Sequence, residues 1–211
     1  MSGELLSSTL LQRQAGAFII EDDWARDLDL AGNAPAPLAT ADRHGHVVYI
    51  RSLAKSAAPG LRVAAVIARG AALARLKVAR ASQDFFVSGP LQAAALAVVS
   101  APGWKPHLKA VRAALIEGRD VLVGVLREEV GDCVTFQVPT GGMHLWLRLP
   151  DHVCDVALAA DLARNDVIVG AGRPWFPADP EGSFLRLTFA GHPTTLVEGA
   201  KRLSQAIKHK L

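Results

Sequence analysis

Short apolar runs alternate with longer helical stretches along the first half of the chain. Three of these runs are rich in β-branched residues and end in charged or turn residues, which is typical of buried strands: 18–20, 46–52 and 62–68. Leucine, alanine and valine recur at helical spacing in four further segments, which predicts helices over 3–14, 70–82, 91–99 and about 105–129. The segment 31–45 is rich in glycine and proline and is expected to be a loop.

The second half of the chain shows a compact mixed pattern. Apolar alternation predicts strands at 144–149, 166–170 and 184–190, and helical spacing predicts helices at 153–164 and 194–209. We therefore expect an α/β protein with two lobes that are joined by a helix near residues 100–130. The expected boundaries are 1–104 for the first lobe and 105–211 for the joining helix and the second lobe.

Composition narrows the class of protein. The chain has 211 residues, of which 50% are hydrophobic and 20% are charged, and this balance excludes a disordered or collagen-like chain. A net charge of +3 is too small to indicate nucleic-acid binding by itself. Only two cysteines occur, and the N-terminus shows no signal-peptide pattern, so we expect a cytoplasmic protein. The uncharged stretch 85–104 is broken by glycine and proline, so no membrane span is expected, and no histidine spacing predicts a metal site.

The richest chemistry follows the second predicted strand. Ser52, Lys55 and Arg62 place a hydroxyl, an amine and a guanidinium within eleven positions of an otherwise apolar segment. An amine can form a Schiff base with a carbonyl group, and a guanidinium can bind phosphate oxygens with two hydrogen bonds. This set therefore suits a phosphorylated carbonyl compound, although a lysine after a strand is more commonly an ordinary surface residue.

Two segments carry a resemblance to a known family. Glu21-Asp-Asp-Trp24, and Tyr49 to Arg62 (YIRSLAKSAAPGLR), resemble fold-type I pyridoxal-phosphate (PLP) enzymes. They look most like the class I and II aminotransferase domain of MocR-type regulators in the GntR family, with its E-D-D-Y and (S/T)-x-S-K-x-x-x-P-x-L-R motifs. Asp22 precedes Lys55 by 33 positions and Arg62 follows it by 7, as in that family. The likeness extends over about 15–207, through the segments 88–92, 107–112, 141–150, 169–176 and 185–190.

The resemblance implies a role for each matching residue. Lys55 would be the Schiff-base lysine, and Asp22 would pair with the pyridine nitrogen of PLP. Ser52 and Arg62 would hold the phosphate, Trp24 would stand beside the ring oxygen, and Arg186 would bind the carboxylate of an amino-acid ligand. A cross-strand ion pair is the alternative role for Arg186.

Four positions depart from the family pattern. Trp24 replaces a tyrosine that donates a hydrogen bond, and Ala54 replaces a hydroxyl residue. Arg51 and Ala64 replace glycine or similarly small residues. Together they predict relaxed chemistry, because a misplaced site loses most of its rate.

The resemblance also implies that the fold is larger than this chain. We expect the C-terminal part of a PLP-dependent transferase fold: about three of seven large-domain strands, followed by a small α/β domain. The regulator's DNA-binding segment would lie outside the chain, and the open strand edges predict a partner chain, most simply in a homodimer. The expected function is PLP-dependent recognition of an amino acid or amine, with transamination in doubt. The alternatives are a degenerate effector-binding or dimerisation domain without PLP, and a small enzyme unrelated to PLP.

Overall fold

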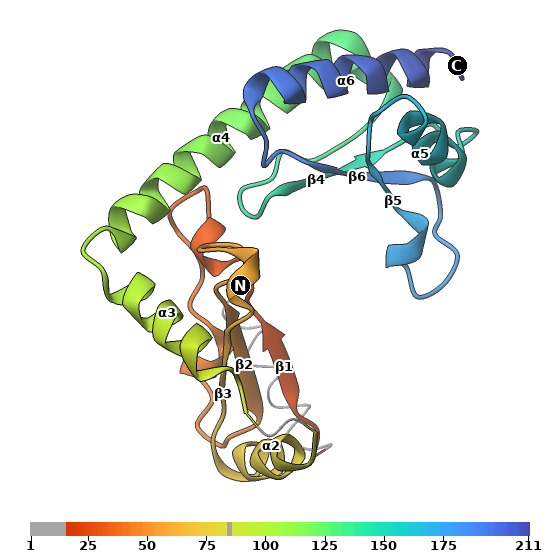
Figure 1. Ribbon diagram of the computed structural model, residues 1–211. Helices are drawn as coiled ribbons and strands as arrows, with labels where there is room; N and C mark the ends of the chain where they lie inside the picture. Colours follow the sequence, from red (N-terminus) through yellow and green to blue (C-terminus); the bar gives the residue numbers. More distant parts are fainter. Residues whose placement is uncertain (1–15, 84–85) are drawn as a thin grey trace. The chain divides into compact units, whose positions relative to one another are not determined.

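The computed structural model describes residues 16–83 and 86–211 (Figure 1). The chain divides into two compact units, Met1–Lys109 and Ala110–Leu211. The helix expected over 3–14 lies outside the described residues. No helix within the described ranges is long and apolar enough to cross a bilayer.

A three-stranded sheet forms the centre of the first unit. Its strands are β1 (Ile19–Asp22), β2 (Val47–Ser52) and β3 (Ala64–Ile67), in the order β1-β2-β3 (Figure 1). β1 is parallel to β2, and β3 is antiparallel to β2. The three strands predicted from apolar runs are thus confirmed, with β3 shorter than expected.

Helices and short 3-10 turns complete the first unit. The helices predicted over 70–82 and 91–99 are confirmed as α2 (Gly70–Gln83) and α3 (Gly89–Ser100). The 3-10 turns are η1 (Arg26–Leu28), η2 (Leu38–Thr40) and η3 (Pro59–Leu61). The core of the unit is small and contains Leu28, Val47, Val48, Tyr49, Ala72 and Ala95.

One buried carboxylate organises the turn that leads into β2. Asp42 is 4% exposed, and it accepts hydrogen bonds from the backbone N–H groups of His44, Gly45 and Val47 at 2.9–3.0 Å. Burial alone would raise the pKa of Asp42, but the backbone donors outweigh burial and hold that pKa below its ordinary value. The charged form of Asp42 therefore stabilises this turn.

The sheet of the first unit leaves apolar side chains in solvent. All four residues of β3 are exposed, and Val66 and Ile67 retain 47% and 53% of their accessible surface. Ile20 on β1 is 70% exposed. Exposed apolar side chains on short edge strands are a surface that proteins usually cover.

The second unit packs helices on an antiparallel sheet. β4 (His144–Arg148), β6 (Phe184–Thr188) and β5 (Gly170–Ala171) form the sheet in the order β4-β6-β5. The helices are α4 (Trp104–Glu129), which begins in the first unit, α5 (Asp155–Ala163) and α6 (Pro193–Lys208), and short turns lie at η4 (Gly131–Cys133) and η5 (Arg173–Trp175). Inward-facing leucines of β4 and β6 form the core together with leucines of the helices: Leu126, Leu145, Leu147, Leu158, Leu162, Leu185, Leu187 and Leu203.

Gly118 is where α4 approaches the end of β6. A Cβ atom at this position would lie 2.3 Å from the carbonyl oxygen of Phe189. Gly118 looks like a weak point when only helix propensity is considered. The structure shows that the missing side chain allows close packing of α4 within the second unit.

The strand expected at 166–170 begins later, at Gly170. Asp166 has a left-handed backbone (φ 59°), and the N–H of Val167 turns back to the carbonyl of Leu162 at 2.9 Å. These residues therefore close the C-terminus of α5 instead of joining the sheet.

Candidate functional site

Four of the predicted site residues meet at one edge of the first sheet. Asp22 ends β1 and Ser52 ends β2, and these strands run in parallel, so their carboxyl ends share an edge. β3 runs the opposite way, so Arg62, two residues before it, reaches the same edge. Lys55 lies in the turn that follows Ser52. The spacing of these residues along the chain thus becomes proximity at one place.

Asp22 and Ser52 also share one face of the sheet. Asp22 is paired with Ile50, and Ser52 is two residues further along β2, so both point to the same side. The intervening residue, Arg51, points to the opposite face. There its guanidinium lies 2.5 Å from the carboxylate of Asp27, whose side chain is only 8% exposed.

The pair of Arg51 and Asp27 changes the expectation for Arg51. An arginine in place of a small residue was one of the four departures that predicted relaxed chemistry at the site. The structure directs its charge to Asp27 on the other face. Arg51 therefore leaves the Asp22 face unobstructed.

Three charged side chains at this edge are available for binding. Asp22, Lys55 and Arg62 are exposed, and within the described ranges they make no side-chain hydrogen bond or ion pair. Their neighbour Asp23 is engaged: it accepts a hydrogen bond from Tyr49 Oη at 2.9 Å and lies 3.4 Å from the guanidinium of Arg26. Of these two adjacent carboxylates, Asp22 is the one open to a ligand.

Tyr49 supports the conformation of Asp23. Burial raises the pKa of the Tyr49 hydroxyl, and its hydrogen bond to the Asp23 carboxylate raises that pKa further. Tyr49 therefore remains a donor near neutral pH, and it holds Asp23 away from the ligand-binding role. Trp24, the next residue, is half-buried after the end of β1.

Hydrogen bonds on both sides of Lys55 hold its turn. The Oγ of Ser52 accepts from the N–H of Ala54 at 3.1 Å, and the N–H of Ala57 donates to Leu53 at 2.9 Å. The backbone of this turn is thereby ordered, while the amine of Lys55 stays free.

A third bond to the turn comes from the beginning of α4. His107 Nε2 lies 2.8 Å from the carbonyl oxygen of Ser56, and a carbonyl only accepts, so Nε2 donates. The imidazole stacks on Trp104 with ring centres 5.5 Å apart. Sequence reasoning missed this role of His107, because a contact over 51 positions leaves no local pattern.

Arg62 has an unusual backbone conformation. Its φ of 48° and ψ of 34° lie in the left-handed region, where a residue with a side chain is less stable than glycine by about 1 kcal/mol. Such conformations often occur at functional sites. An arginine at this position places a guanidinium at the sheet edge, although glycine would give a more stable backbone.

Arg186 belongs to the second unit, which is described by itself. It lies in β6, opposite Trp146 of β4, and its guanidinium carbon is 4.2 Å from the ring centre of Trp175. Within the described residues it forms no ion pair. The cross-strand ion pair considered as the alternative role of Arg186 is thus not formed there.

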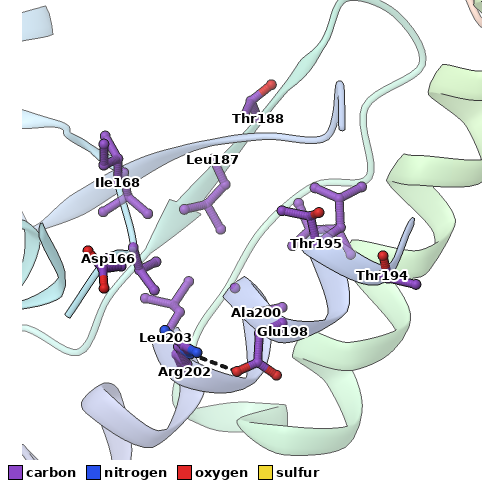
Figure 2. A pocket seen from close by; sticks show the side chains of 15 residues that line it. Asp166, Ile168, Leu187, Thr188, Thr194, Thr195, Glu198, Ala200, Arg202 and Leu203 are labelled. Carbon is purple, nitrogen blue, oxygen red and sulfur yellow. Dashed lines mark hydrogen bonds and ion pairs between the residues drawn. The ribbon is translucent and has the colours of Figure 1, made fainter. Parts of the chain in front are cut away.

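The second unit also contains an apolar cavity of about 480 Å³ between α4, α6 and the segment before β5. Figure 2 shows Ile168, Leu187 and Leu203 in its wall and the ion pair of Glu198 and Arg202 at 2.7 Å. None of the predicted site residues lines it. Among the described residues, no cluster of three or more histidine, cysteine or acidic side chains could hold a metal ion.

Comparison with known proteins identifies the relatives of this chain. The model of the family "Aminotransferase class I and II" matches residues 13–203. The HTH-type transcriptional regulator YisV of Bacillus subtilis is 31% identical over 73% of this chain and 32% of its own length. The 2-aminoadipate transaminase of Thermus thermophilus is 30% identical over 92% of this chain and 50% of its own.

The fold has close counterparts among solved structures. The α-aminoadipate aminotransferase LysN of Thermus thermophilus, in complex with N-(5'-phosphopyridoxyl)-L-leucine, matches with a TM-score of 0.89 and 28% identity. The match covers 99% of this chain and 55% of that protein. These comparisons confirm the expected fold class, an α/β structure that forms part of an aminotransferase fold. The chain spans about a third to a half of the length of the curated relatives it matches.

Proposed function

Because this chain belongs to the family of class I and II aminotransferases, we propose that it binds pyridoxal phosphate as the aminotransferase-like domain of a MocR-type transcriptional regulator. In this role it recognises an amino acid or an amine and acts as a homodimer. Its similarity to the regulator YisV supports the regulatory role. The exposed apolar side chains of β3, an outer strand of the sheet, support a protein partner that covers this strand.

One observation carries the proposal: Asp22, Lys55 and Arg62 lie unpaired at a single sheet edge. The charged residues beside them are engaged, since Asp23 pairs with Arg26 and Asp27 pairs with Arg51. A carboxylate, an amine and a guanidinium without partners match the groups of pyridoxal phosphate, which offers a pyridine N–H, an aldehyde and a phosphate.

Each residue then has a separate task. Arg62 and the hydroxyl of Ser52 hold the phosphate, and Asp22 accepts a hydrogen bond from the pyridine nitrogen. Lys55 provides the amine for covalent attachment, and Trp24 lies beside the ring. When bound, the cofactor supplies an electron sink that stabilises negative charge on the α-carbon of an amino acid.

We propose that these tasks are divided between two parts of the chain. We assign cofactor binding to residues 1–104, and we assign the joining helix and carboxylate binding by Arg186 to residues 105–211. Arginine suits a carboxylate because its planar guanidinium donates two parallel hydrogen bonds.

A second candidate is a domain that keeps the fold for effector binding or dimerisation without the cofactor. The specific observation in its favour is Trp24, which stands where the family pattern has a hydrogen-bonding tyrosine and makes no side-chain hydrogen bond within the described residues. Catalytic turnover is the activity that this substitution affects most directly, so sensing is favoured over transamination.

The proposal is tested by titrating the chain with pyridoxal phosphate and recording the absorbance of the bound cofactor. Wild type is expected to bind one equivalent, Lys55→Ala to lose the absorbance band of the covalently attached form, and Asp22→Asn to shift that band. Lys77→Ala is the matched control, because Lys77 is an exposed lysine on α2 of the same unit. Equal spectra for Lys55→Ala and Lys77→Ala would show that Lys55 is an ordinary surface lysine and would overturn the proposal.

A further inference from the structure

The two faces of the second sheet differ in chemistry. One face is formed by leucines of β4 and β6 that are completely buried. The other face carries Trp146 and Phe184 beside Arg186, because residues that alternate along a strand point to opposite sides. An arginine on this face is surrounded by aromatic rings rather than by acidic residues.

Three rings contact one another beside Arg186 and form an aromatic wall, made of Trp146, Phe176 and Phe184. Trp146 stacks on Phe184 with ring centres 5.6 Å apart and an interplanar angle of 20°. Phe176 lies 5.4 Å from Phe184 and 5.9 Å from Trp146. These three rings are half-buried, so each keeps a part that a ligand can reach, and Trp175, which lies on Arg186, is 58% exposed.

Arg186 is fixed from two directions. The indole of Trp175 lies 4.2 Å from its guanidinium carbon, and Gly170 faces it across the strand pair. A Cβ atom at Gly170 would lie 3.4 Å from Cβ and 3.5 Å from Nε of Arg186, so the arginine stem lies against the backbone of β5. Stacking uses the flat face of the guanidinium and leaves the in-plane N–H donors for another group.

We propose that this face selects aromatic amino acids. Arg186 binds the ligand carboxylate, the aromatic wall contacts the ligand ring, and Trp175 is a positioning residue that holds the guanidinium. The carboxylate role of Arg186 rests on the proposed function, whereas the ligand class follows from the wall. Arg186 has no carboxylate partner within the described residues, so its positive charge matches a ligand with one carboxylate.

Contact between rings should be visible in ligand preference. Aromatic pairs add to the gain from burying apolar surface, so L-phenylalanine should bind about tenfold or more tightly than L-alanine. Phenethylamine keeps the ring and the amine but lacks the carboxylate, so it should bind about tenfold more weakly than L-phenylalanine.

The test is an NMR titration of the full chain with these three ligands, with and without pyridoxal phosphate, following the indole N–H signal of Trp175. The signal is assigned with Trp175→Phe, which keeps an aromatic ring over Arg186 and should retain most of the affinity. Trp175→Ala should reduce affinity for L-phenylalanine several-fold and leave affinity for phenethylamine, which lacks the carboxylate, nearly unchanged. Arg186→Gln should weaken L-phenylalanine at least tenfold. Arg173→Gln is the control, because Arg173 is a nearby exposed arginine paired with Asp179.

Equal affinity for L-phenylalanine and L-alanine, or no binding of either under both conditions, would overturn this inference. An equal loss of affinity for L-phenylalanine and phenethylamine in Trp175→Ala would show that Trp175 is only a structural residue and would overturn its positioning role. These results are distinct from a failure of the proposed function. A chain that takes up no cofactor yet prefers L-phenylalanine through Arg186 would retain the inference and lose the cofactor.

Discussion

Replacing Arg62 with glycine separates the stability of the fold from cofactor binding. Arg62 occupies the left-handed region at φ 48°, which glycine adopts without strain. Relief of that strain is worth about 1 kcal/mol, whereas the added freedom of glycine in the unfolded chain removes about 0.4–1 kcal/mol. The free energy of unfolding of Arg62→Gly should therefore stay within about 1 kcal/mol of wild type.

The same substitution removes the guanidinium proposed to hold the phosphate. A charge-assisted hydrogen bond contributes about 1.5–3 kcal/mol, so affinity for pyridoxal phosphate should fall by roughly 10- to 150-fold. Stability is measured by urea unfolding and affinity by absorbance titration. Asp166→Gly is the matched control, because Asp166 is the other described non-glycine residue with positive φ and lies in the second unit. It should show the same small stability change and full cofactor affinity.

Two results would refute this reasoning about Arg62. Destabilisation of Arg62→Gly by more than about 2 kcal/mol would mean that the arginine side chain supports the fold, contrary to its exposed position without partners. Unchanged affinity for pyridoxal phosphate would mean that the guanidinium does not bind the phosphate. Either outcome would contradict the proposal that Arg62 is kept in its left-handed conformation in order to bind phosphate.

Three further predictions follow from particular contacts. Gly118→Ala should destabilise the protein by about 2 kcal/mol in urea unfolding, because its Cβ would lie 2.3 Å from the Phe189 carbonyl oxygen. The control Gly124→Ala, whose Cβ meets open space, should stabilise the protein by up to about 1 kcal/mol, and equal effects of the two substitutions would rule out close packing at Gly118. His107→Phe keeps the ring beside Trp104 but loses the donor to Ser56, so the amide hydrogen of Ala57 should exchange with deuterium about fivefold faster. His107→Gln should restore part of the protection, and unchanged exchange in His107→Phe would argue against anchoring of the Lys55 turn by His107. Folding lowers the pKa of Asp42, so its contribution to the free energy of unfolding is complete above the pKa of the unfolded state, near 4, and is lost as pH falls through the folded pKa. The difference in free energy of unfolding between wild type and Asp42→Asn should therefore narrow from pH 6 to pH 3, and a constant difference would contradict this role of Asp42.

Much of the fold could be predicted because its signals are local. Apolar runs that end in charged residues predicted the strands of the first sheet, and the helical spacing of leucines and valines predicted α4 almost to its ends. The prediction of a strand over 166–170 was wrong before Gly170, because the apolar residues of this segment match a strand pattern although they follow the end of a helix. Only the left-handed conformation of Asp166 and the bond from Val167 to Leu162 show that the chain is closing a helix there.

The candidate site was predictable in its charged residues but not in their supports. The resemblance of the motifs around Asp22, Lys55 and Arg62 to a known family led us to expect that the three residues share a site. The bond from His107 to Ser56 and the pair of Arg51 with Asp27 join residues that are 51 and 24 positions apart. Packing of distant segments creates these contacts, and no local pattern of residues reports it.

Covalent attachment of pyridoxal phosphate to Lys55 can be measured by trapping the adduct. The chain is incubated with pyridoxal phosphate, reduced with borohydride, digested and analysed by mass spectrometry. We expect the reduced pyridoxyl group on the peptide that contains Lys55, at near one equivalent, with Lys77 and the other exposed lysines modified only in trace amounts. Random modification of surface lysines with Lys55 left free would contradict attachment at Lys55.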